Sequence, residues 1–238
     1  MDSEVQEMLY FSNEFIFLCQ SVFVAFFAIG AVFFGVGGLT SLVALCALLS
    51  NLFIGKQATL FGFDVVTCDA LVIGSDIAIH LIYEYFGKKA AEKAIQLCLY
   101  LSIFFIGISQ LFLWYTPNVF DTSQSYYQAI FGPMPWIIGT SCIVALMTKV
   151  LNLTLYHLFS VRWGRKKFFT KTILALLISQ LFDTVAFTLI ALSSTVHSVI
   201  DVIIFSYAVK CIAIFSGIPF VSFLRRFLPF SPHSESEK

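Results

Sequence analysis

Long apolar stretches, separated by short polar or glycine-containing breaks, account for most of the chain. A helix needs about 20 mostly apolar residues to cross the hydrocarbon core of a bilayer. Stretches of that kind occur seven times, which predicts seven membrane-spanning helices. In chain order they cover residues 15–35, 38–55, 65–86, 95–115, 135–159, 171–192 and 199–224.

The breaks predict how these helices connect. Gly35, Gly37 and Gly38 predict a tight turn between an antiparallel first and second helix. Gly87 is expected to cap the C-terminus of the third helix. The longest connection covers only residues 116–135, so we expect no second, soluble domain.

Lysine and arginine gather in alternate connections, and this asymmetry predicts the orientation. Three lysines lie between the third and fourth segments, five basic residues lie around the break between the fifth and sixth, and two arginines follow the seventh. The opposite connections hold Lys56 and no other Lys or Arg. Cytoplasmic connections carry the positive excess in membrane proteins, so we expect the N-terminus outside and the C-terminus in the cytoplasm. The basic residues are Lys88, Lys89, Lys93, Arg162, Arg165, Lys166, Lys167, Lys171, Arg225 and Arg226.

This orientation completes the predicted domain organisation. A single transmembrane domain over residues 15–228 lies between an acidic extracytoplasmic tail, residues 1–14, and a polar cytoplasmic tail, residues 229–238. The N-terminal tail lacks the basic region of a cleaved signal peptide, so the first helix is expected to be retained.

Composition supports a membrane fold and argues against several functions. Of the 238 residues, 59% are hydrophobic and 12% are charged, and the mean hydropathy is +0.90. Soluble domains carry about 25% charged residues, so we expect an all-α polytopic membrane helical bundle. The formal net charge of zero argues against nucleic acid as a partner. The six cysteines occur singly, which fits neither a zinc site nor a disulfide framework.

The chain also lacks the short motifs of the common enzyme classes. Neither H-E-x-x-H nor G-x-S-x-G occurs, and the nucleotide-binding loop G-x-x-x-x-G-K-[ST] is missing. We therefore expect no enzymatic activity, no ATP hydrolysis by this chain, no bound metal and no cofactor.

Four charged residues fall near the middle of predicted helices: Asp76, Lys149, Asp183 and Lys210. A charge at the bilayer centre costs at least about 2.5–3.5 kcal/mol, so such residues usually face the bundle interior and pair. Two acids and two bases allow Asp76–Lys210 with Asp183–Lys149, or the crossed pairing. A buried ion pair is often no more stabilising than apolar packing, so four such charges favour a polar cavity.

Other polar residues share helix faces with these charges. Asp69, Asp76, His80 and Glu84 are spaced seven, four and four residues apart, which places them in one stripe along the third helix. We expect the last three of them to border a translocation cavity. The further candidates for the interior are Asn51, Gln180 near Asp183, and Tyr207 near Lys210.

Two other interpretations of these charges stay open. Asp76, His80 and Glu84 offer ligand types that suit zinc, manganese or iron, which would make the chain a divalent-cation permease. One helix cannot enclose an ion, however, and the sequence shows no second cluster of acids and histidines. In the other interpretation the central charges only lock the packing of a structural membrane protein, and apolar replacements would leave function intact.

Three sequence blocks carry a resemblance to a known family. The first joins SNLFIGKQATLFGF at 50–63 to YEYFGKKAA at 83–91, and the second is YYQAIFGPMPWIIGTSCIVAL at 126–146. The third combines SQLFDTVAFTLIAL at 179–192 with YAVKCIAIFSGIPF at 207–220. In their order and spacing these blocks resemble the bacterial queuosine-precursor transporters, the YhhQ family.

The resemblance implies both a fold and an activity. The fold is a six-helix core similar in plan to small membrane vitamin-binding proteins, here with one additional N-terminal helix. The activity is uptake of 7-deazaguanines across the bacterial cytoplasmic (inner) membrane, for modification of the tRNA wobble position. These compounds are 7-cyano-7-deazaguanine, 7-aminomethyl-7-deazaguanine and queuine. The energy source, a separate energising module and a homo-oligomer are left open.

The chain departs from the family pattern at two places. His80 stands four residues before Glu84, where the family has an aspartate, and Asp76 is one turn earlier on the same stripe. In the last helix Gly217 and Pro219 occupy a position where many members have D-T-P. This pair is also expected to kink or open that helix. The departures leave substrate choice and proton coupling open.

The edge chemistry of a deazaguanine suggests roles for the candidate residues. The base presents an N–H beside an amino group, and one carboxylate can accept from both. Asp183 is the first choice for this carboxylate and Glu84 the second. An aromatic ring, Phe187 or Tyr207, is expected to stack on the base. The candidate substrate-binding residues are Asn51, Gln57, Asp76, Glu84, Gln180, Asp183, Tyr207 and Lys210, and the candidates for ion pairing or coupling are Asp76, His80, Lys149, Asp183 and Lys210.

Overall fold

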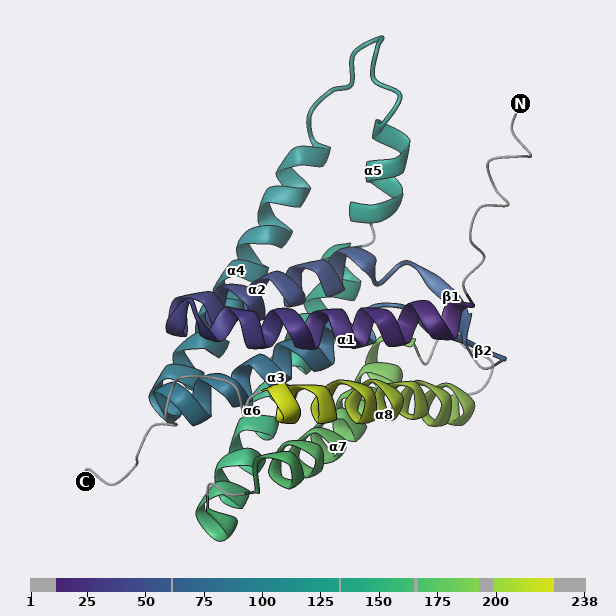
Figure 1. The fold of residues 1–238 in the computed structure, drawn as a ribbon. Coiled ribbons are helices and arrows are strands. Elements are labelled where there is room, and N and C mark those ends of the chain that lie inside the picture. Colours follow the sequence, from purple (N-terminus) through teal and green to yellow (C-terminus); the bar gives the residue numbers. More distant parts are fainter. Residues whose placement is uncertain (1–11, 61, 133, 165–166, 193–198, 225–238) are drawn as a thin grey trace.

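The computed structural model describes residues 12–60, 62–132, 134–164, 167–192 and 199–224, which form a bundle of helices with one small hairpin (Figure 1). The described residues contain eight α-helices and two short strands, and a π-helical turn, Thr188–Leu192, extends α7. The elements are α1 (Asn13–Val32), α2 (Gly35–Phe53), β1 (Gln57–Leu60), β2 (Phe63–Val66), α3 (Asp69–Phe86), α4 (Lys88–Leu113), α5 (Gln124–Phe131), α6 (Met134–Trp163), α7 (Phe168–Phe187) and α8 (Val199–Leu224).

The structure confirms the all-α polytopic bundle. Each of the seven apolar segments coincides with a long helix, and six of these helices are long and apolar enough to cross a membrane: α1, α2, α4, α6, α7 and α8. The seventh, α3, has three carboxylates within 18 residues, which lowers its hydropathy. The predicted domain boundaries near residues 14 and 228 remain predictions, because residues 1–11 and 225–238 lie outside the described part.

The connection before α3 differs from the expected polar break. Strands β1 and β2 pair antiparallel there, with Gln57 opposite Val66 and Leu60 opposite Phe63. Gly62 adopts a φ of 85° beside the turn, which a residue without a Cβ tolerates. The third helix therefore begins at Asp69 rather than at residue 65, because residues 63–66 extend as a strand.

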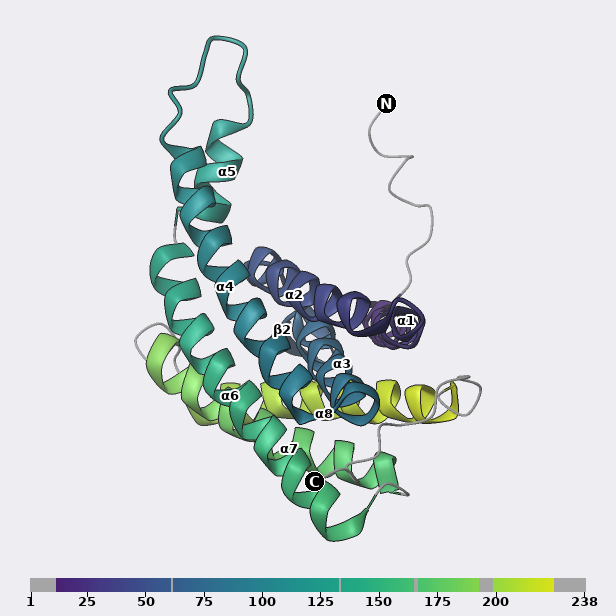
Figure 2. The same ribbon diagram turned by 90° about the vertical axis from the view of Figure 1, so that its left-hand side faces the viewer.

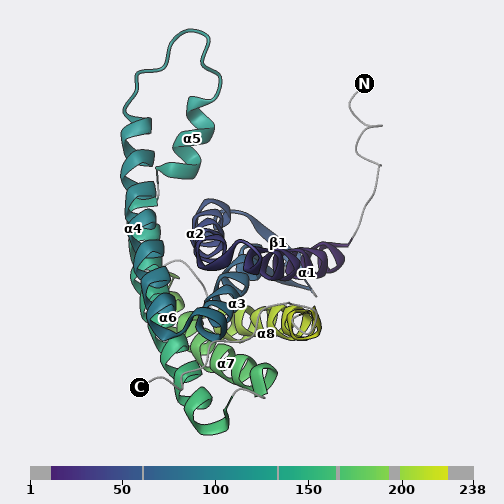
Figure 3. The ribbon, with the colours of Figure 1, turned by 60° about the vertical axis from the view of Figure 1, so that its left-hand side comes forward.

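A second difference lies in the longest predicted connection, which contains the short helix α5. This helix packs on the end of α4, with the rings of Phe112 and Tyr127 5.0 Å apart and edge-on. Gln110 also donates from Nε2 to the backbone oxygen of Phe131 at 2.9 Å. Figures 2 and 3 show that α5 and the loop before it extend away from the other helices. Aromatic contacts, which the break pattern did not reveal, thus organise this connection.

The two glycine predictions at helix ends are confirmed. Gly35 adopts a φ of 70° at the turn into α2, and a Cβ at Gly38 would lie only 2.8 Å from the backbone oxygen of Ala31. Gly87 has a φ of 84° at the end of α3, and its N–H donates to the backbone oxygen of Tyr83 at 3.0 Å. Both turns need a residue that tolerates positive φ.

The described helices give the bundle two distinct ends. Asn13 at the start of α1 donates to the backbone oxygen of Thr59, which places the hairpin beside that helix (Figure 1). Since α3 follows the hairpin directly, it runs from this hairpin end toward the opposite end. The pairs Asp76–Lys149 and Glu84–Tyr156 show that α6 runs in the same direction as α3. The α3–α4 and α6–α7 connections, rich in lysine and arginine, therefore share the opposite end, which we call the basic end.

Helix α3 forms the centre of the bundle. It packs against α1, α2, α4, α6, α7 and α8, and 16 of its 18 residues are buried. Its carboxylates are thus kept away from lipid by neighbouring helices, which explains how so polar a helix fits this chain.

Helix α8 does not open at its proline. It continues as one helix through Pro219, although that residue has no N–H to donate. Gly217 packs closely at this point, because a Cβ there would lie 3.6 Å from Cδ1 of Ile77 in α3. The expected interruption is therefore not observed, and close packing against α3 supports the helix instead.

Candidate functional site

The polar face of α3 meets side chains from α6, α7 and α8 at four successive levels, starting near the hairpin end. At the first level Nζ of Lys210 lies 2.5 Å from Oδ2 of Asp183 and 4.0 Å from Oδ1 of Asp69. Thr148 donates to the other oxygen of Asp183 at 3.1 Å. One lysine therefore faces two carboxylates at this level.

The second level is centred on Asp76. Lys149 donates to Oδ1 of Asp76 at 3.0 Å and to the hydroxyl of Ser75 at 2.8 Å. Gln180 donates from Nε2 to Oδ2 of Asp76 at 2.9 Å. This arrangement leaves Oε1 of Gln180 buried, with no hydrogen-bond partner in the described part of the chain. The central charges thus adopt the crossed pairing, Asp76–Lys149 and Asp183–Lys210.

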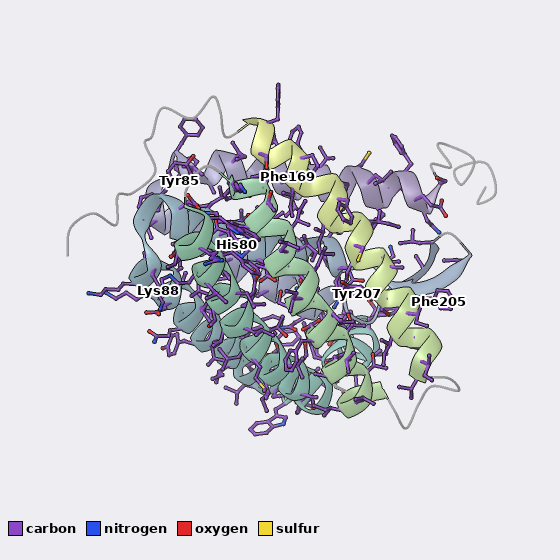
Figure 4. All side chains as sticks on the ribbon, turned by 90° about the horizontal axis from the view of Figure 1, so that it is seen from below. His80, Tyr85, Lys88, Phe169, Phe205 and Tyr207 are labelled. Carbon is purple, nitrogen blue, oxygen red and sulfur yellow. The ribbon has the colours of Figure 1, made fainter. Side chains whose placement is uncertain are left out.

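The third level is centred on His80, which Figure 4 shows inside the bundle while Lys88 projects from its edge. Its Nε2 lies 3.1 Å from Oδ1 of Asn152, and its ring stacks on Tyr156 with 4.0 Å between ring centres. Neither Nδ1 of His80 nor Nδ2 of Asn152 has a hydrogen-bond partner among the described residues.

The fourth level, nearest the basic end, is a fully buried ion pair. Lys171 donates to Oε1 of Glu84 at 2.6 Å and to the hydroxyl of Ser160 at 3.0 Å. The hydroxyl of Tyr156 donates to the same oxygen of Glu84 at 2.5 Å. Polar contacts between buried side chains therefore continue along α3 almost to its C-terminus.

Two adjoining cavities lie beside the first two levels. The first, with about 650 Å³ of empty space including its open part, is bordered by α2, α3, α4, α6 and α7. The second, with about 760 Å³, is bordered by α2, α3, α6, α7 and α8. Ile54, Asp69 and Thr188, which line the second cavity, belong to the hairpin end of their helices. Asn51 and Asp183 line both cavities, so they lie where the two spaces adjoin.

The structure brings most of the predicted site residues to these cavities. Asp76, Lys149 and Gln180 line the first and Lys210 lines the second. Of the two aromatic candidates, Phe187 lines the second cavity.

Three other predicted residues line neither cavity, and the side chain of a fourth is not described. Tyr207 donates its hydroxyl to the backbone oxygen of Leu177 at 3.1 Å. His80 and Glu84 belong to the third and fourth levels, nearer the basic end, and line neither cavity. This differs from the expectation that both residues border a translocation cavity. Gln57 is in β1, but its side chain lies outside the described part. Whether any of these residues contacts a substrate stays a prediction.

Sequence reasoning missed Lys171, which it counted among the basic residues of a connection. The helix begins three residues earlier, at Phe168, and the Lys171 side chain is only 1% exposed. A signal was present, because Lys171, Ala175 and Ser179 follow one another at intervals of four residues on one buried face of α7. Ser75, Thr148, Asn152 and Tyr156 were also missed, since single hydroxyl or amide residues in an apolar helix are common.

The arrangement does not support the cation-permease interpretation. Asp76, His80 and Glu84 do share one face of α3, but each belongs to a different level with its own partners. Among the described residues no group of three or more His, Cys, Asp or Glu side chains lies close enough to hold a metal ion.

Comparison with known proteins assigns this chain to a family. Residues 72–224, from α3 to the end of α8, match the family described as "Putative vitamin uptake transporter". The chain is 25% identical over 204 residues to the "Probable queuosine precursor transporter" of Bacillus subtilis (strain 168), an alignment that covers 82% of this chain and 87% of that protein. No solved structure matches the chain. The resemblance inferred from the three sequence blocks is thus confirmed, and the chain is a multi-pass membrane protein that belongs to the vitamin uptake transporter family.

Proposed function

We propose that this protein imports queuosine precursors, 7-deazaguanines such as 7-cyano-7-deazaguanine, 7-aminomethyl-7-deazaguanine or queuine, across the bacterial cytoplasmic membrane. The observation that carries the proposal is the position of Asp183, a carboxylate that lines both cavities in the family-matched region. The name of the Bacillus subtilis relative supports the substrate class.

The chemistry of the cavity walls suits the polar edge of such a base. Asp183 accepts from two neighbouring donors, as the N–H and amino group of a guanine-like edge require. Oε1 of Gln180 is a second acceptor, and it has no hydrogen-bond partner among the described residues. Asn51, Lys210 and Phe187 line the cavities, and in this proposal Asn51 and Lys210 donate to the base carbonyl and ring nitrogen while the ring of Phe187 stacks on the base.

Binding in this manner requires the base to replace partners that Asp183 already has. Lys210 and Thr148 hold its two oxygens in the structure described here. A buried ion pair gains little over other well-packed arrangements, because desolvation offsets most of the Coulomb attraction. Exchange of one set of donors to Asp183 for another therefore costs little free energy, which suits a site that must release its ligand.

The two ends of the bundle are consistent with import. The cavities lie toward the hairpin end, whereas the side chains of His80 and Glu84, nearer the basic end, are buried and line neither cavity. The positive-inside rule assigns the basic end to the cytoplasm. In this orientation the N-terminus is outside, the C-terminus is inside, and the substrate site is nearer the external side.

The test is the queuosine content of tRNA in a bacterium that cannot synthesise the modification and lacks its own importer. The native chain is expected to restore queuosine when one of the three precursors is supplied at low concentration. Asp183→Asn replaces one acceptor oxygen with an NH₂ group, which would face a donor of the base. A hydrogen bond to a charged group contributes about 1.5–3 kcal/mol. We therefore expect uptake to fall about tenfold or more.

Glu92→Gln is the matched control, because it also removes one carboxylate charge but on the exposed surface of α4. This variant is expected to restore queuosine as well as the native chain does. Failure of the native chain with all three precursors, when it is shown to be in the membrane, would contradict the proposal. Full activity of Asp183→Asn would contradict the role of that carboxylate.

A further inference from the structure

The charges of the four levels along α3 do not balance. Two of the ion pairs are one-to-one, whereas the lysine of the first level faces two carboxylates. If every group were ionised, these four levels would hold four carboxylates against three lysines, one negative charge in excess. The acids of the four levels are Asp69, Asp76, Glu84 and Asp183, and the bases are Lys149, Lys171 and Lys210.

Asp69 is the carboxylate left over. It is only 8% exposed and lines the second cavity, yet its closest cation, Lys210, is 4.0 Å away and is already paired with Asp183 at 2.5 Å. No hydrogen bond to its carboxylate occurs among the described residues, in contrast to the other three acids. A buried carboxylate without a close partner takes up a proton rather than staying ionised.

The part of the chain that the structure describes offers no other charge to compensate Asp69. Among the described side chains, the titratable groups near it are Cys68 beside it, Asp183 from α7 and Lys210 from α8. Helix α2 contributes no Asp, Glu, Lys, Arg or His, and α6 contributes the neutral Thr148 at this level. The protonation of Asp69 is thus governed by the position of Lys210.

We propose, resting on the function proposed above, that Asp69 is a proton-binding site coupled to the substrate through Lys210. In the empty protein Asp69 holds a proton and Lys210 pairs with Asp183. When the base donates to Asp183 it displaces Lys210, which then pairs with Asp69, and the proton leaves to the water of the cavity. Base and proton therefore bind in competition, one for one.

The displacement of Lys210 that this exchange needs is small. A charge-assisted hydrogen bond between nitrogen and oxygen is about 2.7–2.9 Å long, and Nζ of Lys210 is 4.0 Å from Oδ1 of Asp69. A flexible four-carbon side chain covers such a shift without movement of the helix. Asp69 also lies in the first turn of α3, where the helix dipole favours the ionised carboxylate that the exchange produces.

The first experiment measures binding of 7-cyano-7-deazaguanine to the purified chain by calorimetry, in buffers with different ionisation enthalpies. The native chain is expected to release up to about one proton per base bound at acidic pH, so that its Kd falls by up to about tenfold per unit as pH rises from about 4 to about 6. Asp69→Asn is expected to abolish both the proton release and the pH dependence. It should also bind about tenfold or more weakly, because displaced Lys210 then lacks an ionised partner.

Glu92→Gln, which removes an exposed carboxylate on α4, is the control and is expected to match the native chain in both readouts. Native-like proton release from Asp69→Asn would overturn the proposal, whatever its affinity. A merely structural role of Asp69 would change the affinity but not the number of protons released.

The second experiment does not depend on the substrate. The infrared spectrum of the empty native chain at about pH 5 is expected to contain the carbonyl stretch of a protonated carboxylic acid that Asp69→Asn lacks. Identical spectra of the two proteins in this region would overturn the proton site. If the native chain binds none of the 7-deazaguanines, the proposed substrate is wrong, and the infrared comparison still decides whether Asp69 holds a proton.

Discussion

The ammonium group of Lys171 and the carboxylate of Glu84 form an ion pair that is almost closed off from solvent. They are 2.6 Å apart, and their side chains are 1% and 3% exposed. Two further groups, the hydroxyls of Tyr156 and Ser160, complete their hydrogen bonds. A pair as enclosed as this one adds little net stability, but removal of one partner leaves the other buried without compensation.

We therefore predict that Lys171→Met destabilises the protein by about 3–5 kcal/mol, since Glu84 stays buried without its cation. Adding Glu84→Gln to that variant should recover most of the loss, because no charge is then left uncompensated. Unfolding in detergent micelles, followed by heat or by denaturant, measures both variants against the native chain.

The control for this prediction is Lys88→Met, which removes the cation from the exposed pair with Glu92. Exposed pairs contribute about 0–1 kcal/mol, so this variant should unfold close to the native chain. Equal destabilisation by Lys88→Met and Lys171→Met, or a double variant no more stable than Lys171→Met, would show that charge compensation is not the cause.

At the scale of elements, the contact between α1 and α3 depends on a glycine. A Cβ at Gly74 of α3 would overlap Cγ1 of Val24 in α1. Val24 is buried with Cys46 of α2 and Leu71 of α3, so it has little room to turn away. Its branched side chain also has few rotamers. Gly74 thus sets how closely the first helix approaches the polar central helix.

We predict that Gly74→Ala lowers the stability by about 1–3 kcal/mol, because overpacking separates α1 from α3. Val24→Ala removes the overlapping methyl groups and should partly rescue the variant when the two changes are combined. Thermal unfolding in detergent provides the measurement. If the double variant unfolded at a lower temperature than Gly74→Ala, this result would contradict the proposed overlap.

Gly107 in α4 is the matched control, since a Cβ there would meet nothing within 4 Å. Gly107→Ala should be neutral or should stabilise by about 0.5–1 kcal/mol, because glycine loses more conformational freedom than alanine in a helix. Destabilisation by both glycine replacements would point to a general effect of helix composition rather than to close packing.

At the scale of the whole molecule, the bundle is asymmetric between its two ends. The hairpin, the cavities and the connection that contains α5 lie toward one end, and the two basic connections lie toward the other. This asymmetry, together with the positive-inside rule, predicts which end faces the cytoplasm.

We predict that green fluorescent protein fused to the C-terminus fluoresces, because it folds in the cytoplasm. Alkaline phosphatase inserted at Asp121, in the loop before α5, should be active, since it needs the oxidising side of the membrane. Enzyme activity and fluorescence in intact cells measure the two fusions. The reverse pattern, with a dark C-terminal fusion and inactive phosphatase, would invert the orientation and place the cavities on the cytoplasmic side.

Much of the fold and part of the site follow from the sequence by itself. Length and hydropathy determine the seven long helices, because only a helix satisfies its backbone hydrogen bonds within lipid. Glycine at positions 35 and 87 determines two turns, because both need positive φ. Mid-helix charges in an apolar chain identify Asp76, Lys149, Asp183 and Lys210 as interior residues, since lipid would not accept them.

The tertiary structure alone decided which charges meet and where space remains. Helical periodicity places Asp76 on a face but does not tell which helix that face contacts, so the choice of Lys149 over Lys210 needed the packing of α6 and α8 around α3. The same packing buries Lys171 against Glu84, although its sequence position resembles that of a loop cation. It also leaves Asp183 at open cavities and Glu84 enclosed, because free space depends on how neighbouring side chains fill the bundle and not on the spacing along one helix.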